Sequence, residues 1–228
     1  MPTCTVCGGQ EFDHTQVLWD ALIAQWQLGP DEADYVDRQQ GTHCIACGAN
    51  LRSIALADAI RASVGTPLTL GEFVATPPAQ SLRLLEINEA GSLGPILRRL
   101  PGHTLACYPQ VDIHALPYEQ ATFDLVVHSD TLEHVAHPIR ALAECRRVLK
   151  PGGSLCFTVP TIVGRLTRNR AGLLKSYHGT SETDVDDFLV RTEFGADVWT
   201  YVIKAGFTAL SIHSVEYPCA LAMAANRI

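Results

Sequence analysis

Two matching pairs of cysteines form the clearest metal-binding pattern in the sequence. The segments "CTVCGG" (4–9) and "CIACGA" (44–49) each place two thiolates three residues apart, with a glycine after the second. Two such turns can surround one ion with four sulfurs, which is the tetrahedral geometry of structural zinc. A site closed by four protein ligands has no position for a substrate, so its role would be to hold the fold. The predicted zinc ligands are Cys4, Cys7, Cys44 and Cys47.

The long gap between the two cysteine pairs requires further structure between them. His14 and His43 lie in this gap, and either imidazole is an alternative to one of the thiolates. A single Cys-x-x-Cys pair would also fit a redox motif, but two pairs with matching glycines favour a metal.

Two helices are expected in the first part of the chain. Apolar residues recur at four-residue steps over 15–30, which predicts an amphipathic helix that ends at Gly29-Pro30. A second helix would begin after Asn50, whose side chain can cap it, and stop at Gly65.

Short apolar runs alternate with helical patterns from residue 82 onward, which predicts a doubly wound, mostly parallel α/β sheet. Ligands of such sheets bind at the carboxyl ends of the strands, here near 86–92, 107–113 and 128–134. Strands are expected at 82–87, 103–108, 123–129, 154–160 and 208–218, and helices at 92–100, 137–149 and 197–207.

The length and composition describe a folded protein with a small appendage. Of 228 residues, 47% are hydrophobic and 18% charged, as in ordinary globular domains. We predict a zinc-knuckle and helical segment at 1–65, a linker at 66–80 and the α/β domain at 81–228. No apolar stretch is long enough to cross a bilayer and no signal-peptide pattern is present, so a cytoplasmic location is expected.

The segment "FDLVVHSDTLEHVAHPIRALAECRRVLKPGGSLCFTVP" (123–160) resembles the second half of a class I S-adenosylmethionine-dependent methyltransferase. Within that class it is similar to the type 11 group, in which Leu-Glu-His-Val follows the fourth strand and "RVLKPGG" precedes the fifth. The likeness extends over about 82–217. It implies a Rossmann-like, seven-stranded sheet with an antiparallel last strand, and S-adenosylmethionine as the cofactor.

The resemblance also implies which residues contact the methionine part of the cofactor. Glu86, in "LRLLEINEAGSLG", corresponds to the acid that holds its ammonium group. The three glycines of the usual loop are replaced here by Asn88, Ala90 and Ser92, with Gly91 out of phase. All four residues are small, and asparagine tolerates a left-handed backbone, so a tighter and more polar cradle is sterically allowed.

The acid that usually binds the cofactor ribose is missing. Cys107 or Tyr108 stands at its position, and Tyr108 could cover the adenine face. Asp112 matches the acid that contacts the adenine amine in relatives with an Asp-x-x-x-Leu-Pro segment, and Ile113 would offer its backbone N–H to the ring. Loss of one charged acceptor would weaken binding by roughly ten- to a hundredfold.

Methyl transfer to a hydroxyl needs alignment and gains from a general base, for which histidine is suited near neutral pH. The candidate bases are His128, His134 and His178. His128 and Ser129 would also flank the methionine moiety at the end of a strand. His134, in the Leu-Glu-His-Val segment, would face the acceptor, with a buried structural role as the alternative.

A polar segment at 173–199 is predicted to lie over the sheet and recognise the acceptor. It contains His178, and its other polar candidates suit a polar small molecule or a glycan. They are Tyr177, Glu182, Asp184 and Glu193.

The net charge of −7 makes nucleic acid an unlikely partner, because phosphate binding favours a basic surface. The basic stretch 164–175 is a local exception, for which a solvated face is the simpler explanation. We therefore expect methyl transfer to an oxygen or nitrogen of a polar small molecule or glycan, with no membrane partner. The alternatives are an RNA methyltransferase and a non-catalytic module that binds the cofactor or a partner.

Overall fold

A six-stranded sheet forms the centre of the molecule in this computed structural model, which describes residues 3–177 and 188–228. Its strands are β3 (Arg83–Ile87), β4 (Gly102–Ala106), β5 (Phe123–Ser129), β6 (Leu149–Thr158), β10 (Leu210–Val215) and β11 (Ala220–Asn226). The order is β10-β11-β6-β5-β3-β4; β11 runs antiparallel to both of its neighbours, β10 and β6, and the other neighbouring strands are parallel. The predicted Rossmann-like, mostly parallel sheet with an antiparallel last strand is confirmed.

The sheet has six strands rather than the seven that the resemblance implied. Beyond β4 the segment 107–122 forms turns, one of them closed by a hydrogen bond from the Val111 N–H to the Cys107 carbonyl at 2.9 Å. Pro109 and Pro117 lack the backbone donors that an added strand would use. β4 is therefore an edge strand.

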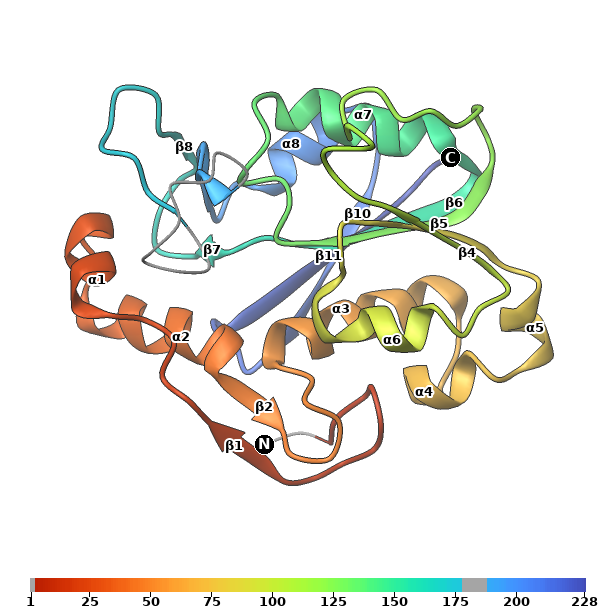
Figure 1. Ribbon diagram of the computed structural model, residues 1–228, viewed down its shortest axis with the longest axis horizontal. Helices are drawn as coiled ribbons and strands as arrows, with labels where there is room; N and C mark the ends of the chain where they lie inside the picture. The colour runs from red at the N-terminus through yellow and green to blue at the C-terminus, as the bar shows by residue number, and fades with distance from the viewer. Residues whose placement is uncertain (1–2, 178–187) are drawn as a thin grey trace.

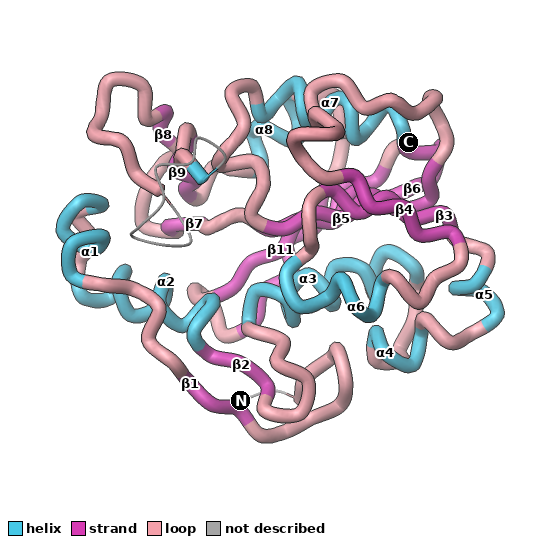
Figure 2. Tube along the Cα trace, viewed as in Figure 1, coloured by secondary structure: helices cyan, strands magenta, loops and turns pink. Residues whose placement is uncertain are grey.

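Helices cover both faces of the sheet (Figures 1 and 2). One face carries α3 (Leu51–Val64) and α6 (Gly94–Leu97), and the other carries α7 (Pro138–Val148) and α8 (Trp199–Lys204). A hydrophobic core lies on each face of the sheet, and successive residues of β5 point into different cores. Val127 packs on the side of α3, and Val126 packs on the side of α7 and α8.

The N-terminal segment differs from the single helix predicted at 15–30. It contains a short pair of strands, β1 (Phe12–His14) and β2 (Thr42–Cys44), and two helices, α1 (Asp20–Trp26) and α2 (Pro30–Gly41). Pro30 begins α2 instead of ending α1, because proline is well suited to a first helical turn. The Glu32 carboxylate completes this start by accepting the Gly29 N–H at 3.0 Å.

Helix α3 has the predicted boundaries and joins the N-terminal segment to the sheet. The Asn50 side chain accepts the Ser53 N–H at 2.8 Å, and Gly65 adopts φ 67° after the last turn. The helix packs across β11, β10 and β6. The stretch predicted as a linker, 66–80, contains two short helices, α4 (Leu70–Phe73) and α5 (Pro77–Gln80).

A small sheet lies beyond the carboxyl end of β6. It consists of β7 (Thr161–Ile162), β9 (Thr192–Gly195) and β8 (Arg168–Asn169), in that order. Among the described residues, no helix is both long and apolar enough to cross a membrane.

Candidate functional site

The loop after β3 is organised by the buried carboxylate of Glu86. Its Oε1 accepts the Ala90 N–H at 2.8 Å, and its Oε2 lies 2.6 Å from Nε2 of His103. Because a carboxylate can only accept, His103 donates through Nε2. Glu86 thus folds the loop and connects it to β4, whereas the resemblance assigned it to the cofactor's ammonium group.

Asn88 ties together the ends of three strands. Its backbone is left-handed, with φ 51°, as is that of Gly91, with φ 55°. The Asn88 side chain accepts the Tyr108 N–H at 3.0 Å and donates to the Thr131 hydroxyl at 3.3 Å. Of the small residues predicted for this loop, Asn88 and Gly91 therefore have left-handed backbone, whereas Ala90 has φ −77°. Contact with a cofactor stays a prediction.

Two further members of this loop are buried. Ala90 is fully enclosed, and the Ser92 hydroxyl has no hydrogen-bond partner among the described residues. A buried hydroxyl without a partner is costly unless a ligand or water completes it.

The turn after β4 presents the residues predicted for the adenosine part. Tyr108 is exposed, and the Cys107 thiol is half-buried, which raises its pKa. The Asp112 carboxylate accepts the His114 N–H at 2.8 Å, and this bond lowers the pKa of Asp112. Ile113 is buried beside it. At neutral pH, Asp112 is a charged acceptor on an open edge of the sheet.

His128 is the last residue but one of β5 and its side chain is enclosed in the core, which corrects the prediction that it acts as a base. Strand alternation turns it toward the α7–α8 side, where it stacks on Phe157 with the ring centroids 5.0 Å apart. Burial lowers the pKa of His128 to about 3, so the ring is neutral and out of reach of a substrate. The neighbouring Ser129 hydroxyl is also largely buried, 2.8 Å from that of Thr158.

An ion pair that the sequence did not predict lies at the end of β5. Asp130, with φ 49°, pairs with Arg52 of α3, whose side chain is 5% exposed. Asp130 also accepts from the Gln40 amide at 3.3 Å, and Arg52 donates to the Gln39 amide oxygen at 3.1 Å. A lone arginine in the apolar helix "LRSIALADAI" was the available signal, because a buried cation requires a partner.

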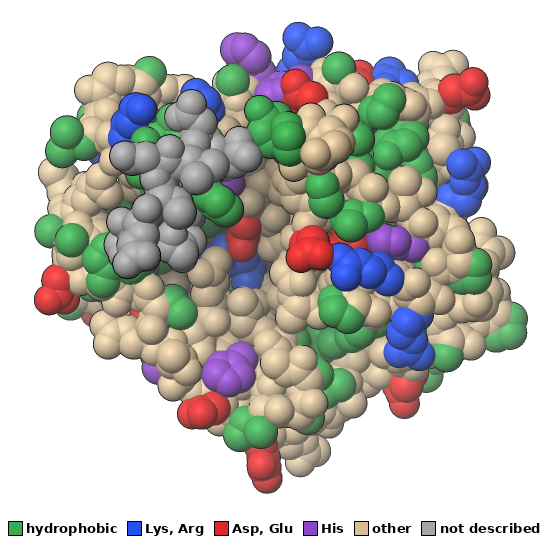
Figure 3. All heavy atoms as spheres, viewed as in Figure 1, with side chains coloured by type: hydrophobic (Ala, Val, Ile, Leu, Met, Phe, Trp, Pro, Cys, Tyr) green, Lys and Arg blue, Asp and Glu red, His purple; other side chains and the backbone are tan. Residues whose placement is uncertain are grey.

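A cavity of about 460 Å³ lies above this ion pair. Figure 3 shows this face hollowed near its middle, with acidic and basic side chains at the bottom. The walls come from α1, α2 and the 160–162 segment, and Phe188 also contributes. Among the described residues, the polar members of the lining are Gln40, Arg52, Asp130, His134 and Thr161, and the other members are apolar.

His134 is the predicted base that reaches the cavity. Its Nδ1 lies 3.2 Å from the Leu189 carbonyl, which can only accept, so Nδ1 carries the proton in the neutral ring, and its Nε2 lies 3.8 Å from the Glu133 carboxylate. Burial lowers the pKa of His134, which keeps it neutral. Burial and the charge of Asp130 raise the pKa of the adjacent Glu133. His178 lies outside the described residues.

The four cysteines meet as predicted. Their sulfurs all lie within 4.8 Å of one another, and the pairs Cys4–Cys47 and Cys7–Cys44 are each 3.7 Å apart. The glycines after each pair, Gly8 and Gly48, have φ 84° and 73°. Both turns are closed by the same hydrogen bond, from the glycine N–H to the carbonyl of the first cysteine. The donor set fits tetrahedral zinc.

Neither alternative ligand joins this cluster in the described part of the chain. His14 pairs with Asp37 at 3.0 Å and lies 3.1 Å from the Thr42 hydroxyl. His43 is 3.1 Å from the Gly41 carbonyl.

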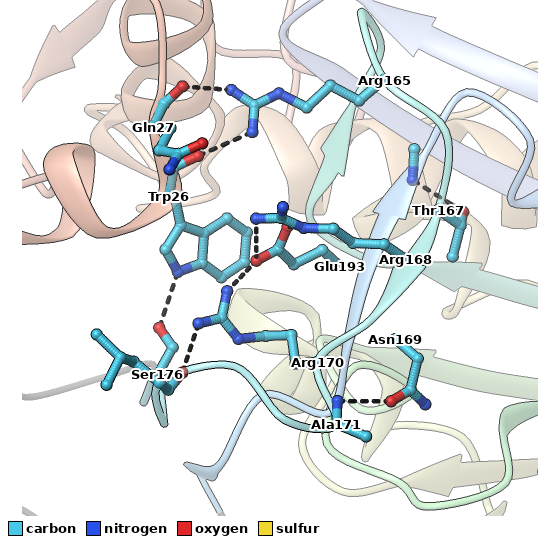
Figure 4. Close-up of polar contacts among 12 residues, drawn as sticks. Trp26, Gln27, Arg165, Thr167, Arg168, Asn169, Arg170, Ala171, Ser176 and Glu193 are labelled. Atoms are coloured by element: carbon cyan, nitrogen blue, oxygen red, sulfur yellow. Dashed lines mark hydrogen bonds and ion pairs between the residues drawn. The ribbon is translucent and has the colours of Figure 1, made fainter.

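The basic stretch 164–175 is mostly exposed, but its three arginines form ion pairs within the protein, and Arg170 is buried. Figure 4 shows Arg168 and Arg170 converging on Glu193, with the Trp26 ring beside them. The Arg170 guanidinium lies 5.5 Å from the Trp26 ring centroid. Arg165 forms an ion pair with Glu32 of α2.

Residues 96–157 match a family model described as a methyltransferase domain. An uncharacterised 37.1 kDa protein in transposon Tn4556 of Streptomyces fradiae is 34% identical over 172 residues, which is 70% of this chain and 48% of that protein. A protein of Mycolicibacterium smegmatis, named as a probable S-adenosylmethionine-dependent methyltransferase, is 38% identical over 46% of this chain and 38% of its own length. This chain thus spans about half or less of these relatives.

A solved S-adenosylmethionine-dependent methyltransferase from Thermotoga maritima aligns with 78% of this chain and 90% of its own, at 16% identity and a TM-score of 0.46. The matched segment 96–157 contains β4 to β6, with the Asp130 turn and His134 between them. The chain therefore carries a methyltransferase domain of the S-adenosylmethionine-dependent class.

Proposed function

We propose that this protein transfers a methyl group from S-adenosylmethionine to an oxygen or nitrogen atom of a small molecule bound above Asp130. The observation that carries the proposal is the cavity at the carboxyl ends of β5 and β6, with His134 in its lining. Thr131, three residues before His134, is hydrogen-bonded to Asn88, so the cavity adjoins the loop after β3. Parallel α/β sheets bind ligands at this edge.

The residues present fit the cofactor. The left-handed backbone at Asn88 and Gly91 keeps the loop close to the carboxyl ends of the strands. The buried Ser92 hydroxyl has no hydrogen-bond partner among the described residues. Tyr108 and Asp112 would hold the adenosine part on the open side of β4. Bound S-adenosylmethionine supplies an already activated methyl group, so the protein's task is to position it and the acceptor.

His134 would act as the general base. Its Nδ1 proton is held by the Leu189 carbonyl, and that backbone is fixed because the Arg191 and Thr192 N–H groups both donate to the Glu133 carbonyl. The ring would thereby be oriented with Nε2, 3.8 Å from the Glu133 carboxylate, as the proton acceptor. Such orientation is what general-base catalysis requires of the protein.

The polar side chains of the described lining come from outside the segment 173–199 that was named for recognition of a polar acceptor or glycan. Of the residues named for that role in 173–199, Glu193 is paired with two arginines, and Tyr177 forms a β-bridge with Leu189. The other candidates fall outside the described residues. Among the described residues of this segment, Phe188, which is apolar, lines the cavity.

The alternative of an RNA substrate has little support. Arg165, Arg168 and Arg170, which suggested a phosphate-binding patch, are engaged by Glu32 and Glu193. The non-catalytic alternative makes a different prediction in its partner-binding form, because that form requires no working cofactor cradle.

Calorimetric titration with S-adenosylhomocysteine tests the cradle. We expect micromolar binding by the unaltered protein and a loss of roughly tenfold or more in Asp112→Ala, because a charged acceptor is removed. Glu119→Ala removes an exposed carboxylate a few residues away and is the matched control. Absence of heat at near-millimolar ligand would favour the non-catalytic alternative.

The protonation of His134 can be measured by long-range proton–nitrogen NMR, with His134→Asn to assign the signal. We expect the Nδ1–H tautomer at pH 7 and protonation only below the ordinary histidine value of about 6.5, since burial disfavours the cation. A ring that is already charged at pH 7, or one protonated at Nε2, would contradict its assignment as the base.

The cysteine cluster is proposed to hold one zinc ion, measured by metal analysis of the purified protein. Cys4→Ser should lose the metal and lower the Tm by at least roughly 5 °C, because each kcal/mol lost shifts the Tm of a chain of this size by about 2–4 °C. Cys107→Ser, outside the cluster, should retain both. Full metal content in Cys4→Ser would refute the four-thiolate site.

A further inference from the structure

The second cysteine turn leads directly into helix α3. The turn is closed by a hydrogen bond from the Cys44 N–H to the Ala49 carbonyl at 2.9 Å, and Asn50 follows as the cap of the helix. The Asn50 side chain accepts the Ser53 N–H at 2.8 Å, and the Asn50 backbone forms a β-bridge with His43 of β2. The cysteine turn therefore sets where the first turn of α3 lies.

The first cysteine turn is hydrogen-bonded to the start of α4. The Thr5 carbonyl accepts the Leu70 N–H at 2.9 Å, and the Val6 carbonyl accepts the Gly71 N–H at 3.0 Å. A Cβ atom on Gly71 would lie 3.1 Å from the Val6 carbonyl oxygen, so these segments are in close contact. Figures 1 and 2 show α3 and α4 on the same face of the sheet. An ion held by the four sulfurs would thus join the starts of both helices.

The first turn of α3 also touches the loop after β3. A Cβ atom on Gly91 of this loop would lie only 3.0 Å from the Ser53 Oγ, and Gly91 has φ 55°. Arg52, the residue before Ser53, pairs with Asp130 at the end of β5. The residue after Asp130 is hydrogen-bonded to the same loop. The loop predicted to cradle the cofactor therefore lies against α3 and against the end of β5.

The first turn of α3 and the strand β3 support this loop together. Ser53 is buried against Gly91, and the Glu86 carboxylate of β3 accepts the Ala90 N–H at 2.8 Å. Protein interiors are close-packed, so a displaced helix start would displace the loop that lies on it. The loop would then lose the arrangement in which it is expected to receive the cofactor.

We propose that Asn50 is a positioning residue for the cofactor loop, and that zinc in the cysteine cluster raises the affinity for S-adenosylmethionine through it. This inference rests on the methyl-transfer function and the zinc site proposed above. A cofactor binds more weakly when only a fraction of the protein has its loop in the binding arrangement. Zinc would raise that fraction by fixing the start of α3. Because two binding equilibria are coupled, the cofactor must raise the affinity for zinc by the same factor.

Calorimetry with S-adenosylhomocysteine on the zinc-loaded protein tests the role of Asn50. Asn50→Ala removes the cap of α3 and should weaken binding roughly threefold or more, because the first turn of the helix loosens. Thr69→Ala is the matched control, since the Thr69 hydroxyl caps α4 by accepting the Glu72 N–H at 3.3 Å. The control should keep the affinity of the unaltered protein, because Arg52 and Ser53 belong to α3. Metal analysis should find zinc retained in both variants.

The reciprocal effect on zinc is a second readout. Zinc affinity, measured by competition with the chelator 4-(2-pyridylazo)resorcinol, should rise roughly fivefold or more when the protein is saturated with S-adenosylhomocysteine. Removal of zinc should weaken S-adenosylhomocysteine binding by the same factor, and added zinc should restore it. Both effects should be smaller in Asn50→Ala than in Thr69→Ala.

Equal affinities of the two variants for S-adenosylhomocysteine would overturn the proposal, because the cap of α3 would then have no particular role. A zinc affinity that does not respond to S-adenosylhomocysteine, or a purified protein without zinc, would overturn it as well. These outcomes differ from a failure of the proposed function. Binding of S-adenosylhomocysteine without the expected differences refutes the coupling alone, whereas no binding by the zinc-loaded protein refutes both.

Discussion

The ion pair between Arg52 and Asp130 is the contact on which the arrangement of the site depends. It joins α3, which follows the cysteine turns, to the loop at the end of β5. The guanidinium is almost fully buried, and removing one partner of a buried pair typically costs ~3–5 kcal/mol. Because Asp130 is a third exposed, the cost here lies toward the lower end. The pair also forms the bottom of the cavity.

The cysteine cluster and the site are coupled through this same helix. The second cysteine turn ends at Ala49, and Asn50 caps α3 in the next residue. A zinc ion in the cluster would therefore fix where α3 begins, and hence where Arg52 meets Asp130. On the other side of the cavity, α1 is held by the arginines of the 164–175 stretch. The apolar walls are thus set by contacts far apart in sequence.

The sequence predicted what local patterns determine. The strands β3, β4, β5, β6 and β10, α3 with Asn50 and Gly65 at its ends, and the meeting of four cysteines were recognisable, because each follows from periodicity, capping or spacing. No strand was predicted over β11, which lies between β10 and β6. The left-handed backbone at Asn88 was anticipated for the same reason. Pro30 was misread because proline both ends one helix and begins the next.

Long-range packing could not be read in this way. Successive residues of β5 point to opposite faces of the sheet, and the sequence alone does not show which face His128 occupies. Because it lies near the end of the strand, it was predicted to contact a ligand. The partner of Arg170 lies 23 residues away on another strand, which made a buried network look like a solvated basic face. The family resemblance implied a seventh strand in a segment that contains prolines. Because proline has no backbone N–H to pair with a neighbouring strand, this segment does not join the sheet.

The most direct test of the account is a crystal structure of the protein with S-adenosylhomocysteine. The account predicts the ligand along the carboxyl ends of β3 and β4, with its sulfur directed toward the cavity that contains His134. Density for the ligand within the apolar cavity between α1 and α2, or away from the 88–92 loop, would contradict it.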